Sequence, residues 1–170
     1  MRASILILLA FWLVAPEARA AGLSVGDRIE PFSLEDQFGE SRGVDDSVRL
    51  LLFSRDMKGG SLLKDAIEPE HAERIRRGEW AYVADISGMP GLIARIFAIP
   101  RMRRRPYPML LDRTGSVTAS LPDRDEEATL IHLDHLRITR IEHLSSPEAV
   151  RAALDQALRG TGAGPAEPGS

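Results

Sequence analysis

The segment from Arg55 to Ser61 contains the residues best suited to chemistry in this chain. Arg55 and Lys58 supply two positive charges, and a glycine pair follows them just before the helix that Ser61 is predicted to cap. Exposed N–H groups at a helix start favour a carboxylate, phosphate or sulfate. The alternative is that the glycines turn the chain and the charges are solvated. The candidate binding loop comprises Arg55, Asp56, Met57, Lys58, Gly59, Gly60 and Ser61.

A second candidate is the charge cluster just before Pro106, made of Arg101, Arg103, Arg104 and Arg105. Clustered arginines gain both Coulomb energy and bidentate contacts with acidic groups. The cluster is therefore a candidate patch for docking the acidic surface of a partner or lipid headgroups. The alternative is a solvated loop, which is the usual role of such a run.

Methionine and histidine side chains supply ligands that copper prefers, so a copper carrier has to be considered. Two of the histidines lie close in sequence, but no Met-x-x-Met or His-x-His tract supports them. Surface histidines and core-filling methionines are the alternative. The scattered set comprises Met57, His71, Met89, Met102, Met109, His132, His135 and His143.

Ser61, Asp65 and His71 contain the residue types of a hydrolytic triad. They fall on one or two short predicted helices, without the Gly-x-Ser-x-Gly turn that exposes a nucleophilic serine. An enzyme with a non-thiol mechanism is therefore an alternative function for which the sequence offers no motif.

The chain has no cysteine. The thiolate is the nucleophile in disulfide exchange and in peroxide reduction, so thiol oxidoreductase and peroxidase activities are excluded. We expect no catalytic residue, metal site or cofactor. The formal net charge of −3 gives no attraction for nucleic acid.

The N-terminus has the plan of a secretory signal peptide. Arg2 precedes an apolar run from Ile5 to Val14, and small residues surround a predicted cleavage after Ala20. The run is shorter than the roughly 20 residues that span a bilayer. We therefore predict a signal peptide at 1–20, one folded domain at 21–159 and a disordered Gly- and Pro-rich tail at 160–170. The mature chain would be periplasmic, without stable membrane insertion.

The candidate residues are positioned by strands and helices, which the alternating apolar runs and amphipathic stretches predict. Val48 to Phe53 and Trp80 to Ile86 are almost unbroken apolar runs, typical of strands buried on both faces. Pro69 interrupts the helical pattern between them. Strand, helix, strand and helix in this order favour a parallel sheet. After the second strand, Pro90 opens a helix that runs until Pro100 and carries on one face Leu92, Ile93, Ile96 and Phe97.

The second half of the chain predicts an antiparallel arrangement. Tyr107 to Leu111 forms a short strand that Asp112 to Gly115 closes as a turn. Ala128 to Leu133 and Arg137 to Leu144 alternate polar and apolar residues around a tight connection, which indicates a hairpin. A last helix begins after Ser146 and has Gly160 as its stop signal.

Several of these segments resemble the redoxin superfamily, which includes peroxiredoxins of the AhpC/TSA type and exported thioredoxin-like proteins. The resemblance covers Leu23 to Leu158 and implies a thioredoxin-like α/β fold. That fold is a three-layer α/β/α sandwich with a central mixed sheet and an N-terminal β-hairpin. The segments are Gly26-Asp27, Phe32-Ser33-Leu34, Asp36, Gly39, Pro108-Met109-Leu110-Leu111-Asp112, Gly115 and Ala128-Thr129-Leu130-Ile131-His132-Leu133-Asp134.

A narrower resemblance, to periplasmic YtfJ-type proteins, rests on Pro90-Gly91, Tyr107-Pro108, the acidic segment Asp123 to Glu127 and the final helix.

The resemblance fails at the residues that would carry the chemistry. In redoxins the active cysteine follows the first buried strand at a helix N-terminus, and this chain has Ser54 to Gly60 there. Glu127-Ala128-Thr129 stands where many members have a cis-proline. The resemblance therefore implies an exported, non-catalytic protein that binds a periplasmic protein or peptide. A copper or anion carrier and a non-thiol enzyme remain the alternatives.

Overall fold

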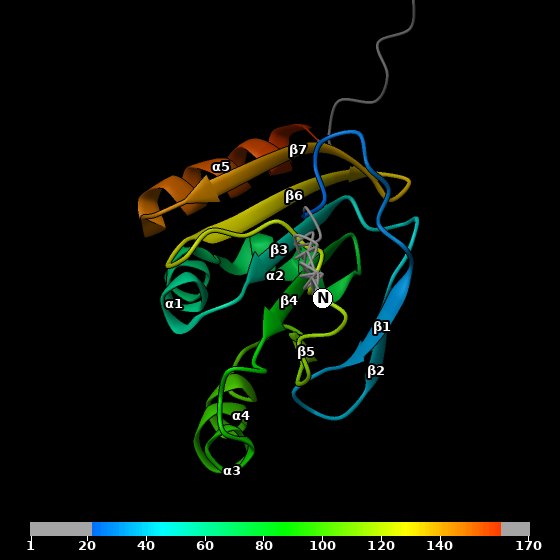
Figure 1. Ribbon diagram of the computed structural model, residues 1–170. Helices are drawn as coiled ribbons and strands as arrows, with labels where there is room; N and C mark the ends of the chain where they lie inside the picture. Colours follow the sequence, from blue (N-terminus) through cyan, green and yellow to red (C-terminus); the bar gives the residue numbers. More distant parts are fainter. Residues whose placement is uncertain (1–21, 161–170) are drawn as a thin grey trace, which may run out of the picture.

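A computed structural model describes residues 22–160 of the chain. The predicted signal peptide, its cleavage after Ala20 and all of the predicted tail except Gly160 lie outside the described residues. The described part contains two sheets, a five-stranded mixed sheet and a two-stranded N-terminal hairpin. Figure 1 shows the larger sheet at the centre, with the hairpin on one side and most of the helices on the other.

The central sheet has the order β5-β4-β3-β6-β7. Its strands are β3 (Leu50–Ser54), β4 (Trp80–Asp85), β5 (Leu110–Asp112), β6 (Ala128–Asp134) and β7 (Arg137–Leu144). The first three run parallel, whereas β6 and β7 are antiparallel to their neighbours. The parallel half and the hairpin predicted from the sequence are therefore confirmed.

The N-terminal hairpin consists of β1 (Phe32–Glu35) and β2 (Ser41–Val44), paired antiparallel. Gly39 takes a φ of +88° in the connecting turn, a conformation that glycine adopts without steric cost. The buried Asp36 carboxylate accepts hydrogen bonds from the N–H groups of Phe38 and Glu40 and from Arg42. These contacts hold the turn between the two strands, and the pairing of β1 with β2 confirms the predicted hairpin.

Residues alternate between two cores on the two faces of the sheet. Leu50 and Leu52 point into a core shared with the helices, while Leu51 and Phe53 point into a second core. The helices on the first face include α1 (Met57–Ala66), α2 (Pro69–Arg76) and α5 (Pro147–Gly160). The hairpin and neighbouring loops cover the second face, where the α/β/α expectation placed further helices. The thioredoxin-like α/β class, the mixed sheet and the hairpin are as predicted.

Helix α2 begins at Pro69, where the sequence predicted a break in the helical pattern, and a buried histidine ties it to α5. The His71 ring is 1% exposed and stacks on Trp80 with ring centroids 5.9 Å apart. Its Nδ1 accepts the Glu68 N–H at 3.1 Å, and its Nε2 lies 2.9 Å from an Asp155 carboxylate oxygen. The Nδ1 contact therefore caps the start of α2, and the Nε2 contact joins α2 to α5.

Between β4 and β5 the chain forms one helical arm, defined here as residues 91–102. It consists of α3 (Gly91–Ile93), the π-helical segment η1 (Ala94–Ala98) and α4 (Ile99–Met102). The prediction that this helix ends at Pro100 is wrong, because helical structure continues to Met102. The Ile99 N–H bonds to the Ala94 carbonyl, and this wider spacing accommodates the Pro100 ring and its missing N–H.

Two further boundaries differ slightly from the predictions. The strand expected from Tyr107 begins at Leu110, because Pro108 cannot donate a ladder hydrogen bond. Helix α5 includes Gly160, which the sequence placed in the tail. Within residues 22–160, no helix is both long and apolar enough to cross a bilayer.

Candidate functional site

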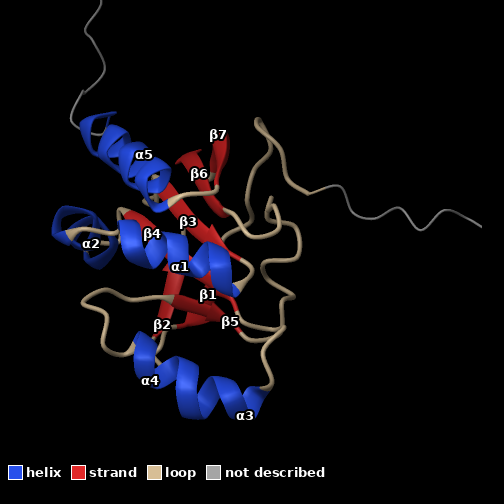
Figure 2. Ribbon diagram, turned by 90° about the vertical axis from the view of Figure 1, so that its left-hand side faces the viewer, coloured by secondary structure: helices blue, strands red, loops and turns tan. Residues whose placement is uncertain are grey.

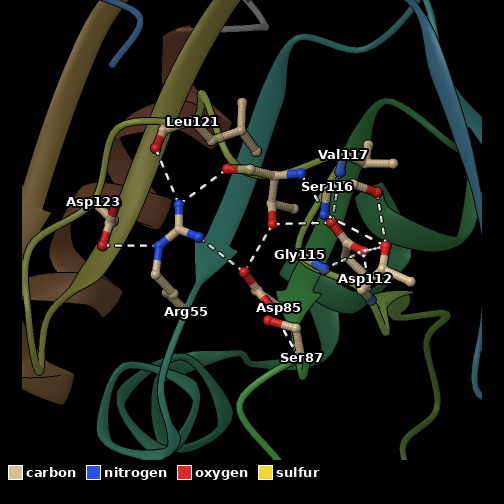
Figure 3. Close-up of polar contacts among 11 residues, drawn as sticks. Arg55, Asp85, Ser87, Asp112, Gly115, Ser116, Val117, Leu121 and Asp123 are labelled. Atoms are coloured by element: carbon tan, nitrogen blue, oxygen red, sulfur yellow. Dashed lines mark hydrogen bonds and ion pairs between the residues drawn. The ribbon is translucent and has the colours of Figure 1, made fainter. Parts of the chain in front are cut away.

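The three parallel strands end at one edge of the sheet, and charged residues gather there. Arg55 directly follows β3, Asp85 ends β4 and Asp112 ends β5. We call this the carboxyl edge. Open α/β sheets place their binding sites outside this edge, because the strand ends and following loops diverge there. Figure 3 shows Arg55, Asp85 and Asp112 close together beside the loop that follows β5. Thr118 of this loop contacts all three side chains.

Arg55 is the centre of this cluster. Its Nη1 donates to an Asp85 carboxylate oxygen at 2.8 Å, and its Nε lies 2.9 Å from an Asp123 oxygen. Its Nη2 donates to the backbone carbonyls of Thr118 and Leu121 at 2.9 and 3.4 Å. The guanidinium also stands over the Phe53 ring, 5.2 Å from the centroid. An external anion would have to displace acceptors that already surround this cation.

Asp112 organises the loop after β5. Its carboxylate accepts the N–H groups of Thr114, Gly115, Val117 and Thr118 at 2.8 to 3.0 Å. Burial would raise the pKa of Asp112, but these hydrogen bonds outweigh it and hold the pKa below its ordinary value. The Thr118 hydroxyl lies within 3.0 Å of both Asp112 and Asp85, so it links the two buried carboxylates.

The start of α1 differs from the sequence expectation. Ser61 is not the N-cap, because the helix begins at Met57 and Asp56 caps it. The Asp56 carboxylate accepts the N–H groups of Lys58 and Gly59, both at 2.8 Å. Ser61 lies inside the helix and its hydroxyl donates to the Met57 carbonyl. Most of the candidate binding loop is therefore helical, and its first N–H groups are occupied by the chain's own carboxylate.

Glu126 and Glu127 lie against this helix start. Lys58 forms an ion pair with Glu126 at 2.6 Å, and the Glu126 N–H donates to Asp56 at 2.8 Å. A Cβ on Gly59 would stand 2.3 Å from the Glu127 carbonyl oxygen, so the close approach requires glycine here. The glycine pair does not turn the chain; it lets the loop approach the helix. No peptide bond within residues 22–160 is cis.

A hollow of about 440 Å³ opens beside the carboxyl edge, between the strand ends and the arm. Ile86 follows β4 and Arg113 follows β5, so the hollow belongs to the same edge as Arg55. Among the described residues, neither Arg95 nor Arg113 forms an ion pair at this hollow. The lining residues are Ile86, Met89, Gly91, Leu92, Ala94, Arg95 and Arg113.

The arginine cluster lies at the end of the arm and just after it. Arg101 is exposed at the end of α4, and Arg104 is exposed in the following turn. Arg103 donates to the Gln37 carbonyl at 2.8 Å, which ties this turn to the β1–β2 connection. Arg105 is half-buried. The structure thus brings the cluster together on one side of the molecule, apart from the α1 start.

The histidines of the copper set and the residues of the proposed triad have separate partners. His132 contacts Glu142, His143 contacts Thr129, and His71 is buried between helices. In the part of the chain that the structure describes, no group of three or more His, Cys, Asp or Glu side chains is placed to hold a metal. Ser61, Asp65 and His71 do not form a hydrogen-bonded triad within residues 22–160, because each has other partners.

Sequence reasoning missed the cluster around Arg55 and the hollow. The available signal was the position of Asp85 and Asp112, each at the end of a predicted parallel strand. Strand ends meet at one edge of a parallel sheet, so their polar residues meet as well. The hollow had no comparable signal, since it depends on how the arm lies against the strand ends.

No protein-family model matches the sequence, and the comparison with curated proteins found no match. Solved structures do match. A protein assigned as a disulfide isomerase from Bacteroides thetaiotaomicron is 14% identical, with a TM-score of 0.57 over 81% of this chain and 89% of that one. The peroxidoxin BcpB of Mycobacterium tuberculosis is 20% identical, with a TM-score of 0.52 over 80% and 96%.

The thioredoxin domain of a thiol-disulfide oxidoreductase from Bacteroides vulgatus gives a TM-score of 0.54 at 11% identity, over 80% of this chain and 99% of that one. At these identities the likeness establishes the fold. The protein is a thioredoxin-like α/β protein without cysteine. It has no thiolate to attack a disulfide or a peroxide, which is the chemistry expected of this fold.

Proposed function

We propose that this chain is an exported, non-catalytic binding protein that holds an extended segment of a periplasmic protein or peptide. The observation that carries the proposal is the hollow at the carboxyl edge. Apolar walls from Ile86 and Met89 suit an aliphatic side chain, while Arg95 and Arg113 suit a carboxylate. A segment with an apolar residue beside an acidic one would satisfy both.

The start of α1 supports a binding role without turnover. Asp56 and Glu126 occupy the N–H groups and the cation at the position where the redoxin resemblance places its nucleophile. Met57 remains 79% exposed there and offers a flexible apolar contact to a bound segment. The site therefore provides surface and charge, while its polar groups are already satisfied.

Photo-crosslinking in the native host tests the proposal. A photoreactive phenylalanine analogue placed at Leu92, on the rim of the hollow, should give a discrete protein adduct. Gly91→Trp should abolish the adduct, because a side chain at Gly91 meets no atom within 4 Å and would extend into the hollow. Arg113→Glu should weaken it about tenfold by repelling a carboxylate.

Matched controls separate blockage from misfolding. Gly88 has equally open surroundings but does not line the hollow, so Gly88→Trp should leave the adduct intact. Arg124→Glu reverses an exposed charge elsewhere and should also leave it intact. Absence of any protein adduct, or equal loss with the control variants, would overturn the proposal.

Export has its own test. The mass of the protein isolated from the periplasmic fraction of its host should equal that of residues 21–170, because the signal is predicted to be cleaved after Ala20. A full-length mass confined to the cytosolic fraction would refute export and leave binding at the hollow to be judged separately.

A further inference from the structure

We infer that the arm docks the protein reversibly onto an anionic bilayer surface. The docking face consists of four outward side chains of the arm, Leu92, Ile93, Ile96 and Phe97, which we call the outer face. Leu92 and Arg95 also line the hollow, but Ile93, Ile96 and Phe97 do not, so variants of these three test the inference separately from the proposed function. The attachment is at the lipid headgroups, without a segment that spans the bilayer.

The outer face is unusually apolar for a surface. Leu92 is 70% exposed, Phe97 is 58%, Ile96 is 53% and Ile93 is 48%. The arm has a separate inner face, where Ala94 and Ile99 are buried and Met102 packs against the core. The arm is therefore already anchored, and the outer face is not needed to hold it in place. A helix with Leu and Phe on one side and arginines beside them is typical of attachment in the plane of a membrane interface.

The charge of the arm and its flanks is entirely positive. The sequence from Ile86 to Leu111 contains five arginines and no acidic residue, although the chain as a whole carries −3. None of the five forms an ion pair with a described residue, whereas arginines such as Arg55 and Arg76 do. Arginines without an ion-pair partner next to an apolar face complement anionic headgroups. The five are Arg95, Arg101, Arg103, Arg104 and Arg105.

The position of the arm permits contact with a flat surface. In both ribbon views the arm lies at the end of the molecule opposite α5 and β7 (Figures 1 and 2). Figure 2 shows α3 and α4 as one continuous helical segment along this end, with both sheets on the same side of it. A bilayer can therefore approach the outer face without first meeting the rest of the protein.

Two other occupants fit these observations less well. A second copy of the chain would bring the same arginines against the first set if the two outer faces met, and like charges repel. A protein partner of ordinary size needs about 800 Å² of contact per side. The four side chains of the outer face supply only the apolar centre of such an interface. A bilayer, in contrast, can take up a few apolar side chains without a large matching surface.

Vesicle co-sedimentation with the protein purified from its host tests this inference. Vesicles of equal parts phosphatidylglycerol and phosphatidylcholine should bind the protein, and vesicles of phosphatidylcholine alone should bind it at least tenfold less. Binding should fall as salt rises from about 0.05 M to about 0.5 M, because the Debye length shortens. Ile93→Ser with Phe97→Ser, and separately Arg101→Glu with Arg104→Glu, should each reduce binding about tenfold or more.

Matched controls lie elsewhere on the surface. Val25→Ser removes a side chain that is 60% exposed, and Arg124→Glu reverses an exposed arginine. Both variants should bind the anionic vesicles like the unmodified protein. No binding to anionic vesicles, equal binding to both vesicle types, or equal loss in the controls would overturn the inference. A discrete protein adduct from a photoreactive residue at Ile96, without vesicle binding, would instead assign the outer face to a protein partner.

Discussion

At the scale of single residues, this protein uses its charges to close the carboxyl edge. Each nitrogen of the Arg55 guanidinium already has an acceptor, because carboxylates and a backbone carbonyl contact Nη1, Nη2 and Nε. Asp112 is 1% exposed yet remains a favourable anion, since backbone N–H groups surround its carboxylate. In other contexts such residues indicate chemistry. Here their geometry indicates a structural lock beside the hollow.

The lock around Asp112 predicts a defined pH dependence of stability. Because its pKa is lowered in the folded state, Asp112 contributes stability at pH values above its unfolded pKa of about 3.9. That contribution is lost as the pH falls through the lower, folded pKa. Asp112→Asn should reduce the free energy of unfolding by about 3 kcal/mol at neutral pH. The difference from the unmodified protein should shrink as the pH falls from about 5 towards 2.

Urea denaturation across this pH range measures the effect. Asp125→Asn is the matched control, because Asp125 is exposed. The control should follow the unmodified protein at every pH. A deficit for Asp112→Asn that stays constant down to the lowest pH would show that the carboxylate charge does not account for the stabilisation.

At the scale of elements, the contact between α1 and the Glu126–Glu127 loop sets a test of the two glycines. Gly59→Ala would force a Cβ to within 2.3 Å of the Glu127 carbonyl and should destabilise the protein by about 2 kcal/mol. Gly60→Ala places its Cβ at ordinary distances, 3.5 Å from the Ser54 hydroxyl. The second variant should be neutral or stabilising by up to about 1 kcal/mol, since alanine favours the helix.

Thermal unfolding of the two variants, followed by circular dichroism, compares them directly. Equal stability of Gly59→Ala and Gly60→Ala would show that the loop does not press on the helix as described. The pair isolates the loop contact, because both residues lie in the same turn of α1 and both gain the same propensity.

The elements also show what sequence reasoning can and cannot predict. Local patterns were sufficient for β7, predicted and found at Arg137–Leu144, and for the break in the helical pattern at Pro69, where α2 begins. They failed at the start of α1, because Asp56 and Ser61 are both good caps and the choice depends on the contact with Glu126. They failed at Pro100, because packing of Ile99 overrides the local preference. The Arg55 cluster joins residues from four separate segments, so no local pattern contains it.

At the scale of the whole molecule, the charge is divided unevenly. The stretch from Ile86 to Leu111 is purely basic, so the remainder of a chain with net charge −3 is strongly acidic. Such a division orients a protein in the field of a charged surface. It places the basic arm towards an anionic bilayer and the acidic remainder away from it. The hollow lies beside the arm, so a segment bound there would be held near the same surface.

We also expect the central sheet and the arm to differ in local stability. Strand β3 is buried along its whole length between β4 and β6, so its amides should open only on global unfolding. The arm has one exposed face and rests on the core through few side chains, chiefly Ala94, Ile99 and Met102. Its amides should therefore exchange through a local opening of about 2 to 4 kcal/mol, below the 5 to 15 kcal/mol typical of global unfolding.

Hydrogen exchange measured by mass spectrometry distinguishes the two modes. Low concentrations of urea should speed exchange in β3 but leave the arm almost unchanged, because a local opening exposes little new surface. Helix α5 serves as the internal control, since Val150 and Leu154 are fully buried and its amides should behave like those of β3. If the arm instead responded to urea as β3 does, it would be part of the cooperative core. The outer face would then be a rigid surface of the folded domain.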